Sequence, residues 1–272
     1  MISRHPLSPS RWAWTLPLAI AVLAAACEDS LSVDIPETSW GFVEIVAATA
    51  TGGGHQTVPE AFFFRGRLGG IPRSDLTFDS CNTVSYSPGG GALTGVTYVD
   101  AGAQLGFTLG GASNPLDRIV DTERTFYQPT GGALSYTPGD SVVVDVPGSV
   151  GGFPAASIRA RTAEAFTMST IDIPQGTEAI ELTWTAASVP GSAMVVSLPF
   201  AAEGSATMNQ QVLCTFRDDG ADSIKFAWYQ DWATAGERDA FSTRLRTNYT
   251  SVASGATLGV VSTYQVPTPN VP

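Results

Sequence analysis

Runs of glycine interrupt the chain about every twenty residues, and this punctuation restricts the elements that can form. The runs lie at residues 52–54, 69–70, 89–91, 110–111, 131–132 and 151–152, with no sequence repeat beneath them. Glycine weakens helix and strand interiors and favours turns, so regular structure is confined to short segments between the runs. Three such segments, residues 40–47, 94–100 and 141–146, are rich in β-branched and aromatic side chains. Their length and composition predict strands.

Later segments alternate apolar and polar residues with a period of two, which is typical of antiparallel sheets with one face in water. One face of residues 178–186 carries Ile180, Leu182 and Trp184, and one face of residues 193–199 carries Met194, Val196 and Leu198. In residues 241–249 the expected inward set is Phe241, Thr243, Leu245, Thr247 and Tyr249, and the set expected to face water is Ser242, Arg244, Arg246 and Asn248. A helix of a turn or two is expected only near residues 225–234.

The predicted fold class is all-β, an antiparallel β-sandwich, because two sheets packed face to face bury the alternating face of each strand. A chain of 272 residues with 43% apolar side chains is long enough for a sizeable core. We expect two tandem immunoglobulin-like or jelly-roll-like modules, residues 40–165 and residues 166–272. One larger continuous sandwich is the alternative.

The N-terminal residues have the features of a secretory signal peptide. Arg4 and Arg11 precede an apolar run that begins at Trp12 and has fifteen residues even when counted through Ala26, fewer than the roughly 18 to 20 that span a membrane. Three alanines then lead to Cys27, a pattern that resembles the lipobox of bacterial lipoproteins, in which the cysteine is acylated. The leucine usual three residues before the cysteine is replaced by alanine here. We expect a signal peptide at residues 1–26 and an acylated Cys27 with its tether at residues 27–39; an ordinary signal peptide is the alternative.

The charge balance bears on the partners. The chain has 25 Asp and Glu against 14 Lys and Arg, and loss of residues 1–26 leaves 12 basic side chains and a net charge of −13. Without a basic stripe, no nucleic-acid partner is expected. Anionic headgroups repel such a surface, so the expected membrane attachment depends on the lipid. The expected location is the cell envelope, on the periplasmic or outer-surface face of a membrane.

Two further cysteines, Cys81 and Cys214, form an even pair in an oxidising compartment, which favours a disulfide. A loop of about 130 residues closed by this bond contributes on the order of 5 kcal/mol in the chain-entropy account. Two buried free thiols are the alternative.

Several short stretches carry a resemblance that covers much of the chain. They are residues 61–64 with Cys81, residues 98–102, 136–139, 146–153, 181–185 and 212–220. In this order they resemble an uncharacterised group of bacterial secreted proteins and lipoproteins. That group is similar to tandem β-sandwich modules, so the resemblance implies an architecture and no active site.

The candidate chemistry is sparse, and no cofactor is expected. His55 is the one histidine after residue 26, and no G-x-S-x-G motif presents a nucleophile. Asp218, Asp219 and Asp222 could offer oxygens to Ca²⁺ but lack EF-hand spacing, and a tight Asp-Gly turn is favoured.

The aromatic side chains of Trp228, Tyr229 and Trp232, beside Phe226, are the candidate ligand-binding residues. They predict either a flat platform that stacks on sugar rings or a set of rings that cap the sandwich core.

Together these features favour a cell-envelope lipoprotein that acts as a non-catalytic binding or structural β-sandwich module, with an envelope protein or a glycan as partner. One alternative is a carbohydrate-binding or carbohydrate-active protein, which predicts an aromatic cleft with a carboxylate pair. Another is an accessory subunit of an envelope complex, which predicts an exposed apolar patch.

Overall fold

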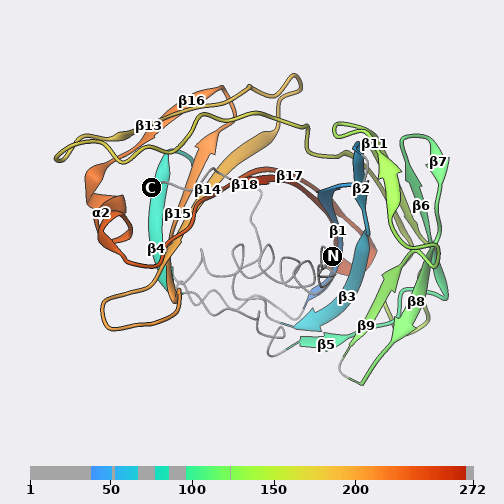
Figure 1. Ribbon diagram of the computed structural model, residues 1–272. Helices are drawn as coiled ribbons and strands as arrows, with labels where there is room; N and C mark the ends of the chain where they lie inside the picture. The colour runs from blue at the N-terminus through green and yellow to red at the C-terminus, as the bar shows by residue number, and fades with distance from the viewer. Residues whose placement is uncertain (1–37, 51–52, 67–76, 86–95, 123, 268–272) are drawn as a thin grey trace, which may run out of the picture.

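The computed structural model describes residues 38–50, 53–66, 77–85, 96–122 and 124–267 (Figure 1). The predicted signal peptide and Cys27 lie outside the described residues. The described residues are mostly strands, with one short α-helix, α2 (Phe226–Thr234), and one 3-10 turn, η2 (Ala253–Gly255). The predicted all-β sandwich class is therefore confirmed.

One large curved sheet contains most of the strands, in the order β12-β11-β6-β8-β9-β3-β1-β18-β17-β14-β15-β4. At one end lie β12 (Ala156–Arg161), β11 (Ser141–Val146), β6 (Gln104–Leu109), β8 (Leu116–Val120) and β9 (Thr125–Gln128). The central strands are β3 (Glu60–Gly66), β1 (Thr38–Thr49), β18 (Thr257–Pro267) and β17 (Phe241–Ser251). At the other end lie β14 (Ser192–Phe200), β15 (Gln210–Arg217) and β4 (Ser80–Ser85).

Six short strands complete the fold. Off the main path, β2 (His55–Thr57) pairs with β1 and β10 (Leu134–Tyr136), β5 (Val96–Tyr98) pairs with β3, and β7 (Ala112–Ser113) pairs with β6. A separate two-stranded antiparallel sheet contains β13 (Ile180–Thr183) and β16 (Ala221–Ile224).

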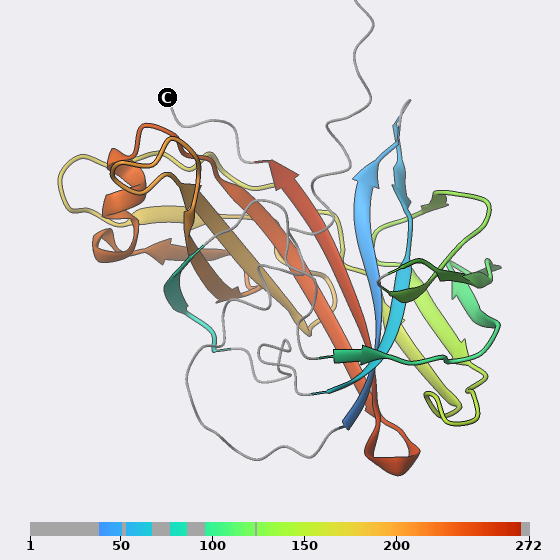
Figure 2. The ribbon, with the colours of Figure 1, turned by 90° about the horizontal axis from the view of Figure 1, so that it is seen from below.

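Two cores show how the large sheet builds two sandwiches. The first core lies between β6, β11 and β12 on one side and β1, β3 and β18 on the other. The second lies between β14, β15 and β4 on one side and β13, β16 and α2 on the other. Seen from below, β17 and β18 run between the two sandwiches (Figure 2). The central strands are thus common to both halves of the molecule.

A third apolar cluster covers the opposite face of these shared strands, so their two faces are both buried. Its members are Phe42, Phe62, Phe64, Phe126, Val195, Leu213, Leu245 and Val261. In β1, Phe42 belongs to this third cluster while the next residue, Val43, belongs to the first core. The ring centroids of Phe42 and Phe64, on adjacent strands, are 5.8 Å apart.

The pairing of the strands differs from the expected arrangement in two respects. First, β1 and β18 are parallel, from Trp40 opposite Thr257 to Ala47 opposite Tyr264, so the large sheet is mixed and not purely antiparallel. Second, β18 pairs with β1 and β4 pairs with β15, so strands from both sides of residue 165 share one sheet. Residues 40–165 and 166–272 therefore do not form separate sheets.

One expectation about β17 is wrong. Ser242, Arg244 and Arg246, which alternation assigns to water, are only 0%, 1% and 9% exposed. The reason is that residues 164–165, 185 and 189–190 pack on this face of β17, where their backbone carbonyls accept hydrogen bonds from Arg244 and Arg246. Local alternation reports which residues share a face, and it does not report what covers that face.

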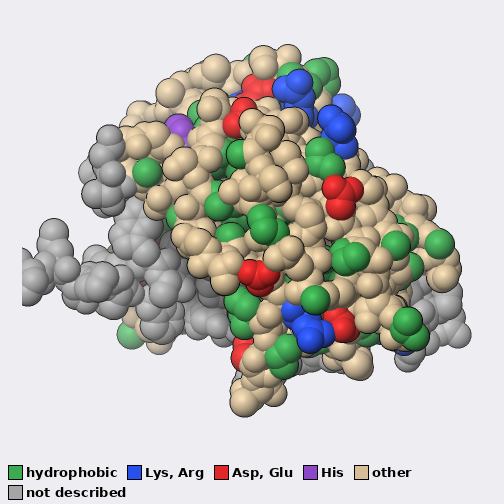
Figure 3. Space-filling view, turned by 90° about the vertical axis from the view of Figure 1, so that its right-hand side faces the viewer, with side chains coloured by type: hydrophobic (Ala, Val, Ile, Leu, Met, Phe, Trp, Pro, Cys, Tyr) green, Lys and Arg blue, Asp and Glu red, His purple; other side chains and the backbone are tan. Residues whose placement is uncertain are grey.

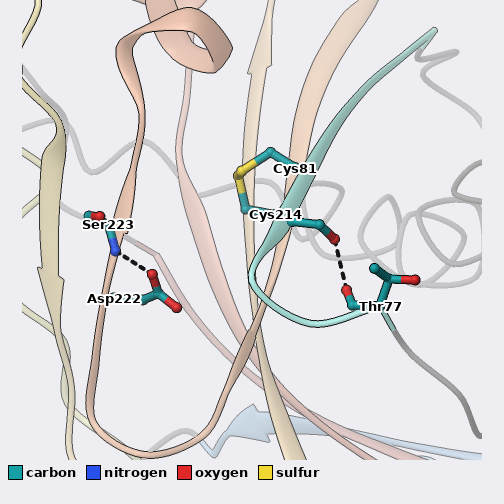
Figure 4. The surroundings of a disulfide bond; sticks show 6 residues. Thr77, Cys81, Cys214, Asp222 and Ser223 are labelled. Carbon is teal, nitrogen blue, oxygen red and sulfur yellow. Dashed lines mark hydrogen bonds between the residues drawn. A yellow bond between two sulfur atoms is a disulfide. The ribbon is translucent and has the colours of Figure 1, made fainter.

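The predicted disulfide is confirmed. Cys81 of β4 and Cys214 of β15 stand opposite each other in register, with Cα atoms 4.0 Å apart and a separation of 133 positions in sequence (Figure 4). Cys81 is the buried residue of β4, while Asn82 and Thr83 beside it are exposed. The bond therefore fastens an edge strand that buries little apolar surface of its own.

Candidate ligand-binding site

The candidate aromatic residues do not form a platform. Trp228 is 39% exposed, whereas Tyr229 and Trp232 are each 1% exposed and pack in the second core. The Tyr229 hydroxyl donates a hydrogen bond to the Glu178 carbonyl at 2.5 Å, and the Trp232 indole N–H donates one to the Asp239 carbonyl at 2.8 Å. Two of the three rings are thus held inside the fold, as the core-capping alternative requires, and the sugar-platform interpretation is corrected.

The candidate calcium residues are also dispersed. Asp218 lies beside a corner, Gly220 at φ +110°, that carries the chain from β15 in the large sheet to β16 in the small one. Asp219 is exposed. The Asp222 carboxylate accepts a hydrogen bond from the backbone N–H of Ser223, with an N to Oδ1 distance of 2.6 Å (Figure 4). Burial raises the pKa of the Asp222 carboxyl, and the nearby charge of Asp79 adds to this rise.

Asp218 is engaged in a buried ion pair. The Arg244 Nε lies 2.6 Å from one carboxylate oxygen, and an Arg244 terminal nitrogen donates to the other at 2.8 Å. Trp184 and Ser192 donate to the same carboxylate at 2.9 and 2.6 Å. With its side chain 3% exposed and its oxygens occupied, Asp218 acts as a structural counter-ion.

Two of the stretches behind the family resemblance pack against each other. The backbone N–H of Phe153 donates to the Asp100 carbonyl at 2.8 Å, and that of Gly148 donates to the Ala101 carbonyl at 3.1 Å. The hydroxyl of Tyr127 donates to the Gly102 carbonyl at 2.9 Å and accepts from the Ala101 N–H at 2.8 Å. These residues form a structural junction of the first sandwich.

A carboxylate pair stands on β1 and β3, where Glu44 and Glu60 are directly opposite. Glu44 is 6% exposed, and burial, with a smaller effect from the Glu60 charge, raises its pKa to about 8. Both Glu60 oxygens are occupied, by Arg124 and Gln128 at 2.7 Å each. Both side chains are buried or nearly so, and neither residue lines the grooves described below.

A polar groove of about 490 Å³ lies where the two sandwiches meet on the shared sheet. Its basic residues are Arg159 and Arg161 from β12 and Arg246 from β17. Its remaining lining residues are Ser141, Ala160, Pro190, Gly191, Thr247 and Asn248. The Asn248 side-chain amide donates to the Arg159 carbonyl at 2.7 Å, which ties β12 to β17 across the groove. Clefts between packed units are common ligand sites, and the residues that line this one come partly from the neighbouring strands β12 and β17.

The three arginines differ in how they are held. Arg246 is 9% exposed and donates to the carbonyls of Val189 and Pro190 at 2.5 and 3.1 Å. Burial lowers the pKa of its guanidinium. Arg159 and Arg161 are exposed at the groove, and Arg161 makes one long bond of 3.4 Å to the Gly139 carbonyl. The groove therefore combines one fixed cation with two adaptable ones.

Sequence reasoning missed these residues because it assigned Arg246 to water and gave Arg159 and Arg161 no role. A signal was present, since Arg-x-Arg occurs three times in a chain poor in basic residues, and two of the three, at residues 159–161 and 244–246, supply the basic residues of the groove. In a strand that spacing places both side chains on one face.

A second groove, of about 800 Å³, lies between residues 200–205 and the end of α2 and is bordered by Glu203, Asp231 and Glu237. Among the described residues, no group of three or more His, Cys, Asp or Glu is placed to hold a metal ion. The part of the chain that the structure describes also contains no helix with the length and apolar character needed to cross a membrane. Comparisons with known protein families, with curated proteins and with solved structures find no match.

Proposed function

We propose that this chain is an exported, lipid-anchored and non-catalytic binding protein whose ligand occupies the groove between its two sandwiches. The observation that carries the proposal is the groove itself, which is lined by three arginines and three hydroxyl- or amide-bearing side chains. Its volume of about 490 Å³ falls within the roughly 300 to 1,000 Å³ of small-ligand pockets.

Two further features support the extracytoplasmic part of the proposal. The alanines before Cys27 resemble the pattern of an acylation site, and the Cys81–Cys214 disulfide is compatible with an oxidising compartment. The described body then acts at the membrane surface by contact with its ligand.

Mass spectrometry of the protein from its native membrane tests the anchor. We expect a mature N-terminus at Cys27 that carries acyl chains, and a Cys27→Ala variant that leaves the detergent phase. An unmodified chain that retains residues 1–26 would refute the anchor.

Incubation of the native lipoprotein, in neutral detergent, with an array of envelope oligosaccharides tests the binding role. We expect a bound ligand that is recovered chemically unchanged. Turnover of a bound compound would refute the non-catalytic part, and the absence of any ligand for the groove would refute the binding part.

A further inference from the structure

The arginines that line the groove lack carboxylate partners among the described residues. Elsewhere, Arg118, Arg124, Arg217 and Arg244 pair with carboxylates, whereas Arg65 donates to Ser39 and to the carbonyls of Gly151 and Gly152. Within the described ranges, Arg159, Arg161 and Arg246 have no carboxylate within 4.0 Å, and all three line one groove. The protein as a whole carries a net charge of −11, so this is a local excess of positive charge on an acidic molecule.

Two carboxylates compensate part of this charge. Glu164 and Asp218 both attract the charge of Arg246 while they accept hydrogen bonds from other groups. Burial is the main reason that the Arg246 pKa is lowered, and the charge of Arg161 lowers it as well. Arg159 and Arg161 have no carboxylate within 4.0 Å among the described residues, so their charges favour an added anion.

Arg246 is held in place below the groove surface. Its terminal nitrogens donate to the carbonyls of Val189 and Pro190, and its Nε is buried without a hydrogen-bond partner among the described residues. Since the Nε is buried, Arg246 contributes a fixed positive charge beside the groove, and the direct contacts to a ligand come from the exposed arginines.

We propose that the groove binds the carboxylate or sulfate group of an acidic oligosaccharide, which names the ligand class of the site and rests on the proposed function. Arg159 and Arg161 bind the anionic group directly, since both residues are exposed and a guanidinium group can donate two parallel hydrogen bonds to one anionic group. Arg246 supplies a fixed charge from the floor of the groove.

The other lining residues favour a sugar over other anions. Ser141, Thr247 and Asn248 provide donors and acceptors that suit hydroxyl groups. The lining residues of the groove include no aromatic ring on which a nucleobase could stack. Figure 3, which looks onto the side of the first sandwich, shows Lys and Arg side chains gathered toward the upper edge of this face.

Calorimetric titration of the native lipoprotein, in neutral detergent, tests the ligand class. The probes are a uronic-acid tetrasaccharide, a sulfated tetrasaccharide, their neutral homologue, inorganic phosphate and vesicles with anionic lipid. We expect at least one acidic tetrasaccharide to bind at least about tenfold more tightly than the neutral homologue, with affinity that falls as salt rises. Binding of the neutral homologue with equal affinity, or of phosphate or vesicles in place of both acidic sugars, would overturn the inference.

Variants locate the site. Arg159→Gln and Arg161→Gln should each lower the affinity for the acidic sugar by about tenfold, because each variant loses one charge-assisted contact. Arg217→Gln is the matched control, because it removes the same charge from an exposed pair with Asp79, and it should leave affinity unchanged. Circular dichroism checks that each variant is folded, and equal loss in all three would overturn the assignment to the groove.

The same titrations separate the two proposals. If a neutral sugar binds and Asn248→Ala abolishes that binding, the groove is a ligand site and only the anionic inference fails. If none of the probes binds and the array yields no ligand, the proposed binding function fails with it.

Discussion

Arg244 offers a sharp test of how the second sandwich is held to the shared sheet. The perturbation is Arg244→Met, which keeps an unbranched side chain and removes the charge. Arg244 is 1% exposed, and besides its contacts with Asp218 it donates to the carbonyl of Ala165 at 3.1 Å and to that of Thr185. The variant leaves the Asp218 carboxylate buried without its counter-ion.

The expected loss follows from these contacts. Removal of one partner of a buried pair costs about 3 to 5 kcal/mol. Since Trp184 and Ser192 still donate to Asp218, we expect the lower part of that range. For a protein of this size each kcal/mol lowers the Tm by about 2 to 4 °C, so the expected fall is about 6 to 12 °C. Asp218→Asn in the Arg244→Met background removes the orphaned charge and should recover at least about 1 kcal/mol.

Urea and thermal unfolding followed by circular dichroism, with the disulfide intact, measure these changes. Arg217→Met, which breaks an ion pair between side chains that are 66% and 51% exposed, is the control and should change stability by less than about 0.5 kcal/mol. A loss of less than about 1 kcal/mol in Arg244→Met, or a double variant less stable than the single one, would refute the reasoning.

Three further predictions concern single sites. Since Glu44 has a pKa raised by burial to about 8 from the ordinary 4.5, its protonated form stabilises the fold at low pH, and that stabilisation is lost as pH rises to about 8. Glu44→Gln should remove a pH dependence of the free energy of unfolding worth about 5 kcal/mol between these limits; the same difference in free energy of unfolding between wild type and variant at pH 5 and at pH 9 would contradict this. Cys81→Ser should lower the free energy of unfolding by about 2 to 5 kcal/mol, and reduction of the wild type should give a similar loss; insensitivity to reductant would count against it. Trp232→Ala should cost about 3 to 5 kcal/mol and Trp228→Ala less than about 1, as measured by chemical unfolding, and the reverse order would show that the burial of these rings is misassigned.

Local sequence patterns predicted where the strands and the helix form better than they predicted which strands pair with each other. Residues 141–146 form β11 as expected, and the expected helix near residues 225–234 forms as α2. The parallel contact of β1 with β18 joins residues more than 200 positions apart, and no local pattern encodes such a pairing. The contact of β4 with β15 could be predicted only from the expected disulfide between Cys81 and Cys214.

The candidate site was hidden for a related reason. The alternation of apolar and polar residues correctly placed Arg244 and Arg246 on one face of a strand. Their polarity then predicted, wrongly, that this face is exposed to water. The structure covers that face with the Asp218 carboxylate and with the carbonyls of residues 189 and 190. A polar side chain can face an interior that is itself polar, and only tertiary contacts distinguish that interior from solvent.

The parallel contact between β1 and β18 also bears on how the chain is synthesised. The first core draws Ala256, Leu258 and Val260 from the C-terminal part of a chain whose other contributions to that core end at Ala160. Because a ribosome makes the N-terminus first, roughly a hundred residues are synthesised after Ala160 before the strand that completes the first core. A chain that ends just before β18 would lack Leu258 and Val260 of that core and the parallel partner of β1.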